Sequence, residues 1–162
     1  MERPIDLTFD CADAPAMAAF WKLALGYVDE PAPAPFKTRG EWLASHGVPE
    51  EEWGTGAWLC DPDGIGPRLS ILPVPEAKVA KNRLHMDVRV SRQGSKEDRW
   101  RRLSALADEL VGAGGTVLRP FKDHHVVMAD PEGNEFCLGF AGVDDGRPSG
   151  PRAASDPPPT GR

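Results

Sequence analysis

A four-residue turn motif occurs twice in this chain and divides it into two halves of similar design. The motif Asp-Pro-x-Gly stands at Asp61-Pro62-Asp63-Gly64 and again at Asp130-Pro131-Glu132-Gly133. Proline sets φ at the start of such a turn, and glycine accepts the positive φ that closes it. Each motif lies between two stretches with strand character. The repeat therefore predicts a duplicated unit with a hairpin in each copy.

The first half starts with an alternating segment over residues 5–11, which predicts a half-buried strand. A helix follows, because Asp13 can cap it, Pro15 suits its first turn and Gly26 can end it. Its apolar face comprises Met17, Phe20, Trp21, Ala24 and Leu25. Strands are expected over residues 27–30, 56–60 and 68–74. Residues 31–55, with one or two helical turns, are interpreted as an insertion.

The second half repeats this order. We expect a strand over residues 84–90 and a helix capped by Ser95, and then strands over 116–121, 124–129 and 135–140. Asp61 lies 55 positions after Asp6 and Asp130 lies 45 after His85, so the insertion accounts for the longer first half. The expected fold class is α+β, with two βαβββ modules in one domain over residues 1–142. Residues 143–162, rich in Pro and Gly, are predicted to be a disordered tail.

Charge and length narrow the classes of partner. The 162 residues carry 25 acidic against 19 basic side chains, a net charge of −6, which disfavours binding to nucleic acid or to an anionic membrane. The first residues lack the apolar run of a signal peptide, so we expect a cytoplasmic protein. Three distant cysteines indicate neither a disulfide framework nor a structural zinc site. A small molecule is the expected partner, and a homodimer is compatible with the sequence.

Three segments, FDCADAPAMAAFWKLALGY, RLHMDVRV and VVMADPEGNEFCL, resemble glyoxalase-like domains of the vicinal oxygen chelate superfamily. The likeness spans roughly residues 4–140. EWLASHGVPEEEW also resembles an insertion found in one poorly characterised subgroup. The resemblance implies that the two modules form an open, cupped mixed sheet, with helices on its outer face and a ligand or metal in the cup.

The alternation and the resemblance together predict which side chains line the cup. Residues of the first strand that alternate with its apolar positions point inward, as do those at the start of the fifth and last strands. A tryptophan near the insertion could roof the pocket, since indole rings suit small-molecule sites. The expected cup residues are Asp6, Thr8, Trp58, His85, Asp87, Glu135 and Cys137.

Metal-dependent members of the superfamily hold a divalent ion with four side chains, and the resemblance places Asp6 and His85 in two of these positions. The fourth-strand position falls on Leu72 or, with a shift of two, Ser70, and the usual carboxylate of the last strand is replaced by Cys137. Two ligands are too few for a transition-metal site, so we expect no catalytic metal unless Glu135 or Cys137 substitutes.

Three hypotheses for function follow. The first is a metal-free protein that sequesters or senses a small organic molecule in the cup, as bleomycin-resistance-like relatives do. The second is a divalent-metal-dependent lyase, isomerase or dioxygenase that uses His85 with Asp6 and either Glu135 or Cys137. The third is metal-free acid–base catalysis by Asp6, His85 and Asp87. Fold-level likeness alone does not choose between them.

Truncation after Gly142 should leave the melting temperature almost unchanged, because the segment beyond it shows no core-facing pattern. Thermal denaturation of the full chain and of a chain ending at Gly142 checks this. A fall of several degrees would show that the tail stabilises the domain.

Overall fold

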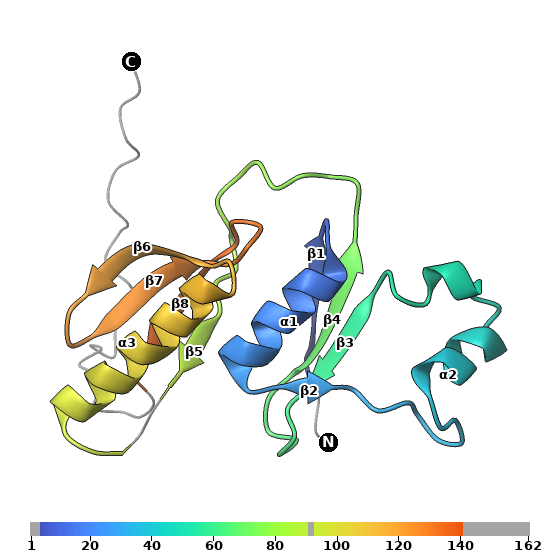
Figure 1. Ribbon diagram of the computed structural model, residues 1–162, viewed down its shortest axis with the longest axis horizontal. Helices are drawn as coiled ribbons and strands as arrows, with labels where there is room; N and C mark the ends of the chain where they lie inside the picture. Colours follow the sequence, from blue (N-terminus) through green and yellow to red (C-terminus); the bar gives the residue numbers. More distant parts are fainter. Residues whose placement is uncertain (1–3, 91–92, 141–162) are drawn as a thin grey trace.

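Each half of the chain folds into a four-stranded mixed sheet with a long helix packed on one side (Figure 1). The computed structural model describes residues 4–90 and 93–140. The first sheet has the order β1-β4-β3-β2 and the second the order β5-β8-β7-β6, with β1–β4 and β5–β8 parallel and the other pairs antiparallel. The strands are β1 (Asp6–Cys11), β2 (Val28–Asp29), β3 (Ala57–Cys60), β4 (Arg68–Pro73), β5 (Asp87–Arg89), β6 (Thr116–Phe121), β7 (His125–Ala129) and β8 (Glu135–Gly139). This confirms the predicted α+β class with two βαβββ modules.

The long helices begin and end where their capping residues indicate. Helix α1 (Ala14–Leu25) follows Asp13, whose side chain accepts a hydrogen bond from the Ala16 backbone N–H at 3.0 Å, and it ends at Gly26 with φ 69°. Helix α3 (Lys96–Gly112) starts at Ser95 with a capping box. The insertion holds α2 (Arg39–Ser45) and a short 3₁₀ helix, η1 (Glu50–Glu52). None of these helices is long and apolar enough to cross a membrane.

The repeated turn has the same backbone design in both modules. Asp61 accepts a hydrogen bond from the backbone N–H two residues later at 2.9 Å, and Asp130 does so at 3.0 Å. Gly64 and Gly133 close the turns with φ of 67° and 84°. The environments differ, because burial raises the pKa of Asp130, whereas backbone N–H donors, that of Asp63 foremost, lower the pKa of Asp61.

The two modules share one hydrophobic core, and aromatic rings of α1 join them. Trp21 lies 5.2 Å from Phe9 of β1 and 5.1 Å from Phe136 of β8, measured between ring centroids. Phe20 makes an edge-on contact with Phe136 at 5.8 Å. Helix α1 therefore packs against both sheets, and the three rings Phe20, Trp21 and Phe136 are each 1% exposed.

Glu132 of the second repeated turn caps the N-terminus of α1. The Glu132 carboxylate accepts hydrogen bonds from the backbone N–H groups of Ala12 and Asp13, each at 2.9 Å. These N–H groups lie at the N-terminus of α1, where backbone donors lack partners within the helix and where negative charge is favourable. The contact links residues that are 120 positions apart in the chain.

The predicted strand over residues 84–90 is too long, because β5 spans only Asp87–Arg89. The Glu135 carboxylate accepts a hydrogen bond from the Asn82 backbone N–H at 3.0 Å and forms ion pairs with Lys78 at 3.3 Å and Lys81 at 3.5 Å. These contacts hold the connecting chain beside the start of β8 before it joins the sheet. The predicted tail, residues 143–162, lies outside the described residues.

Phe20→Ala should lower the free energy of unfolding by roughly 3–5 kcal/mol, the usual cost of removing a buried aromatic ring. Urea denaturation followed by circular dichroism measures this. Leu23→Ala, on the same helix and 41% exposed, is the matched control and should cost about 1 kcal/mol or less. Equal losses in the two variants would contradict the central place of Phe20 in the core.

Glu135→Gln should reduce the dependence of stability on acid pH. Partial burial acts to raise the pKa of Glu135, but hydrogen bonds from Asn82 and Lys78 lower it from 4.5 to about 2. The ionised carboxylate thus stabilises the fold fully above pH 4.5, and this contribution is lost as the pH falls towards 2. The variant should be less stable at neutral pH and lose less on acidification. Equal slopes in urea denaturation between pH 5 and pH 3 would contradict this role.

Candidate functional site

Each sheet has an open face, defined here as the side that lies away from α1 and α3. On the first sheet, alternate residues such as Phe9, Leu69 and Ile71 enter the core, and their neighbours lie on the open face. Thr8 pairs with Ser70 and Ser70 pairs with Trp58, so these three side chains form one row across three strands. Two hydroxyl groups and one indole thus lie together on this face.

The Trp58 ring has room to lie along the open face because the residue two positions earlier is glycine. A Cβ atom at Gly56 would be only 3.3 Å from the ring of Trp58 and 3.4 Å from a methyl group of Leu72. Any larger side chain at position 56 would press against the indole. The glycine therefore sets the position of the aromatic surface.

Next to this row, one carboxylate binds two arginines. Glu30 accepts hydrogen bonds from Arg68 Nε at 2.6 Å and from Arg39 Nη2 at 2.7 Å. Arg68 also donates to the Ser70 hydroxyl at 3.0 Å. Partial burial acts to raise the pKa of Glu30, but hydrogen bonds from Arg68 and Arg39 bring it below its ordinary value. The carboxylate is thus held in its charged form.

The insertion supplies part of this group. Arg39 is the first residue of α2, and its guanidinium carbon lies 5.2 Å from the Trp42 ring centroid and 5.0 Å from that of Trp58. Such contacts between a cation and an aromatic face are attractive and hold the planar guanidinium in place. We name Glu30, Arg39, Trp42, Trp58 and Arg68 the arginine cluster.

Arg68 of the arginine cluster lines a cleft of about 570 Å³, whereas the other four members of the cluster do not. One part of the cleft wall is polar, because it contains the charged side chains of Arg68 and Asp6. Nη1 of Arg68 lies 3.9 Å from the Asp6 carboxylate. Another part is apolar, because Ile5 and Ile65 are 69% and 87% exposed. The lining residues are Pro4, Ile5, Asp6, Gly64, Ile65, Gly66, Pro67 and Arg68. The cleft thus offers both apolar contact and charged groups.

The predicted residues of the second module make contacts of their own. Asp87 forms an ion pair with Arg89 at 3.3 Å and is paired with Cys137 in the register of β5 and β8. His85 precedes β5, and its Nε2 lies 3.2 Å from the Asn82 carbonyl oxygen. Within residues 4–90 and 93–140, no hydrogen bond or ion pair joins His85 to Asp6. Their placement side by side remains a prediction.

The residues at the four metal-ligand positions do not fit a metal site within this chain. Leu72 offers no donor atom, the Ser70 hydroxyl accepts a hydrogen bond from Arg68, and Glu135 is paired with two lysines. In the part of the chain that the structure describes, no three His, Cys, Asp or Glu side chains come together as metal ligands would.

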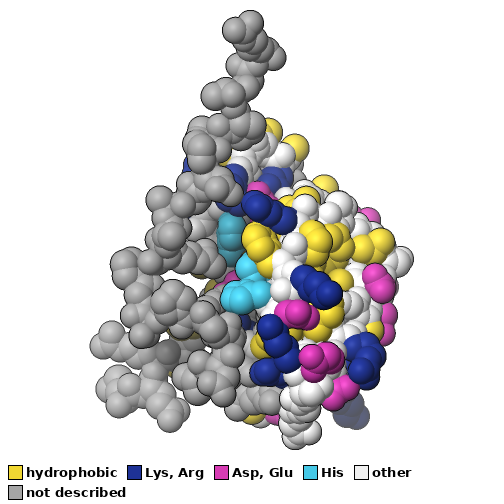
Figure 2. Space-filling view, turned by 90° about the vertical axis from the view of Figure 1, so that its left-hand side faces the viewer, with side chains coloured by type: hydrophobic (Ala, Val, Ile, Leu, Met, Phe, Trp, Pro, Cys, Tyr) yellow, Lys and Arg dark blue, Asp and Glu magenta, His cyan; other side chains and the backbone are white. Residues whose placement is uncertain are grey.

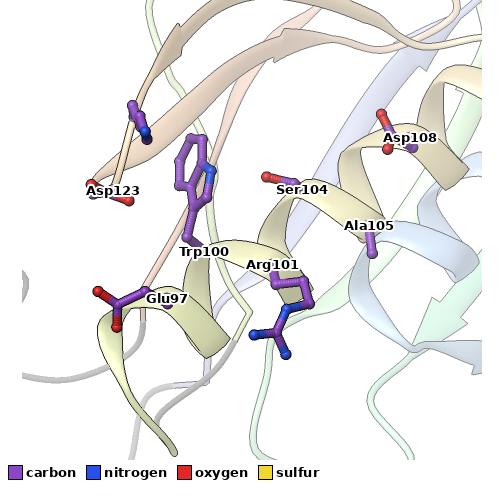
Figure 3. Close-up of a pocket in the computed structure, with 8 residues that line it drawn as sticks. Glu97, Trp100, Arg101, Ser104, Ala105, Asp108 and Asp123 are labelled. Atoms are coloured by element: carbon purple, nitrogen blue, oxygen red, sulfur yellow. The ribbon is translucent and has the colours of Figure 1, made fainter.

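A second hollow, of about 550 Å³, lies between α3 and the turn that follows β6 (Figure 3). Trp100 stands at its centre, between Glu97 and Asp123 on one side and Ser104 on the other. The predicted cup residues are not among those that line it. The surface on the α3 and β6 side of the molecule mixes both signs of charge with exposed apolar side chains (Figure 2). Leu118 of β6 is 51% exposed.

The sequence predicts Thr8 and Trp58 as cup residues, which stays a prediction, and offers Ser70 only as an alternative metal-ligand position. It does not indicate Glu30, Arg39 or Arg68. Arg68 lies two residues before Ser70, so the alternation of β4 was a signal that could have placed it on the open face. Glu30 is the last residue of the strand predicted over residues 27–30 and directly follows β2, whereas Arg39 lies in the insertion and belongs to no periodic strand pattern. The folded insertion brings Arg39 to this face, whereas Glu30 is held beside β3 by the hydrogen bond from its backbone N–H to the Trp58 carbonyl at 2.8 Å.

Comparison with known proteins supports the fold. No curated protein sequence matches the chain. A glyoxalase-related enzyme from Fulvimarina pelagi is 17% identical, with a TM-score of 0.55 and coverage of 87% of this chain and 89% of that one. The fosfomycin resistance protein FosX from Mesorhizobium loti is 13% identical, with a TM-score of 0.57 and coverage of 88% and 94%. At these identities the likeness shows the fold alone.

The sequence model of the glyoxalase-like domain family matches residues 6–139 of this chain. These residues contain both βαβββ modules and both repeated turns. The predicted resemblance to glyoxalase-like domains is therefore confirmed, and the chain belongs to the glyoxalase-like domain family.

Proposed function

We propose that this protein binds a small organic molecule on the open face of the first sheet. The observation that carries the proposal is the arginine cluster, in which half-buried charged and aromatic side chains converge beside a cleft. Ligand sites combine apolar and aromatic walls with a few fixed polar groups, and the 570 Å³ of this cleft lies within their usual size. Thr8 and Ser70 add hydroxyl groups next to Trp58.

The contacts of the other candidate residues favour binding over catalysis. Acid–base catalysis by Asp6, His85 and Asp87 would need these groups to act on one substrate, whereas Asp6 faces Arg68 and Asp87 is paired with Arg89. The metal-dependent hypothesis relies on Glu135 or Cys137 as a replacement ligand, and Glu135 is held by two lysines. Sequestration or sensing of a small molecule, the first hypothesis, needs neither arrangement.

Trp58→Leu should weaken binding of a small molecule by at least about tenfold, because the variant loses the aromatic surface of the site. A ligand is first found by a thermal-shift screen of small organic compounds. Its affinity for the wild type and for the variant is then measured by isothermal titration calorimetry.

Trp100→Leu is the matched control, because Trp100 is also a half-buried tryptophan but lines the hollow on α3. It should leave the affinity unchanged. Loss of binding in Trp100→Leu with full binding in Trp58→Leu would place the ligand site on α3 instead. A screen in which no compound raises the melting temperature would contradict the proposed function.

A further inference from the structure

We infer that the ligand carries an anionic oxygen group, a carboxylate or a phosphonate, and that Arg68 and Arg39 bind it. The inference rests on the proposed function, because it concerns the same open face. It also gives the insertion a role, since Arg39 comes from α2 and Arg68 from β4. The anion subsite would thus be assembled from the sheet and the inserted helix.

The first argument is the number of hydrogen-bond donors that the two arginines keep available. A guanidinium group has five N–H donors and accepts no hydrogen bonds. All the hydrogen bonds of Arg39 leave from Nη2, to Glu30 and to the Pro31 carbonyl. Arg68 donates from Nε to Glu30 and from Nη1 to Ser70. Within the described residues, Nε and Nη1 of Arg39 and Nη2 of Arg68 have no acceptor.

The second argument is the charge balance at the centre of the cluster. Glu30 faces two guanidinium groups and uses one carboxylate oxygen for each of them. Asp6 offsets the second positive charge only in part, because its carboxylate is 3.9 Å from Arg68, beyond hydrogen-bond distance, and its side chain is 59% exposed. A ligand anion can therefore accept a hydrogen bond from Arg68, which Asp6 is too far away to do.

The third argument is the environment of the two arginines. The side chains of Arg39 and Arg68 are only 20% and 32% exposed. Charge-assisted hydrogen bonds are stronger where water is partly excluded. Arg39 is also held by two indole rings, so little side-chain entropy is lost when an anion binds. The apolar wall at Ile5 and Ile65 suits the remainder of such a ligand.

The test compares two probes that differ mainly in charge, 2-naphthoate and the neutral 2-naphthamide, with phenylphosphonate as a second anion. Isothermal titration calorimetry on the full chain should show roughly tenfold or tighter binding of 2-naphthoate than of 2-naphthamide. Arg68→Gln and Arg39→Gln should each remove most of this difference, because each should weaken the binding of 2-naphthoate far more than that of 2-naphthamide. Arg101→Gln, a change at a 75% exposed arginine on α3, should leave it intact.

Several outcomes would overturn the inference. Equal affinity for 2-naphthoate and 2-naphthamide, or full discrimination in both cluster variants, would show that the arginines bind no anion. If neither anion binds at millimolar concentration while neutral compounds from the screen do, the anion subsite is wrong and the proposed function stands. If nothing binds, both fail. Should Arg39→Gln detach the insertion, as judged by near-ultraviolet circular dichroism, Arg68→Gln decides, because Arg68 belongs to the sheet.

Discussion

The packing of α1 against both sheets is the interaction on which the rest of the structure depends. Phe20 and Trp21 contact Phe136 of the second module, and Trp21 also contacts Phe9 of the first. These rings make one core from two small sheets, each of which alone would bury little apolar surface. Because the helices occupy one side of each sheet, strand residues that alternate with core positions, such as Thr8 and Ser70, are left on the other side. The location of the candidate site follows from that packing.

Much of this fold could be predicted from local patterns. The alternation in residues 5–11 and the spacing of Phe20 and Trp21 report burial directly, because period-two and helical patterns reflect which side chains face a core. The start of β5 could not be predicted in this way. Its alternation continues back to residue 84, but the connecting chain is held by Glu135, a contact across more than 50 positions. Local periodicity contains no information about such a long-range hydrogen bond.

The candidate site was predictable only where it lies on regular strands. Thr8, Ser70 and Trp58 follow from alternation and strand pairing. Arg39 and Glu30 lie at the ends of a segment without periodicity, and their approach depends on how α2 folds back on the sheet. The resemblance to metal-binding relatives drew attention to Asp6 and His85 instead. The resemblance identified positions that correspond to metal ligands in relatives. In this chain the charged side chains of the open face contact Glu30 instead.

The Glu132 contact also bears on how the chain folds as it is made. The N-terminus of α1 is synthesised before its partner, because the carboxylate that accepts its N–H groups follows 120 residues later. At 5–20 residues per second, that delay amounts to roughly 6–24 seconds. During this interval the first module has neither its distant cap nor the ring of Phe136 against α1. Helix α1 of the nascent chain therefore lacks these two contacts until the second module has been made.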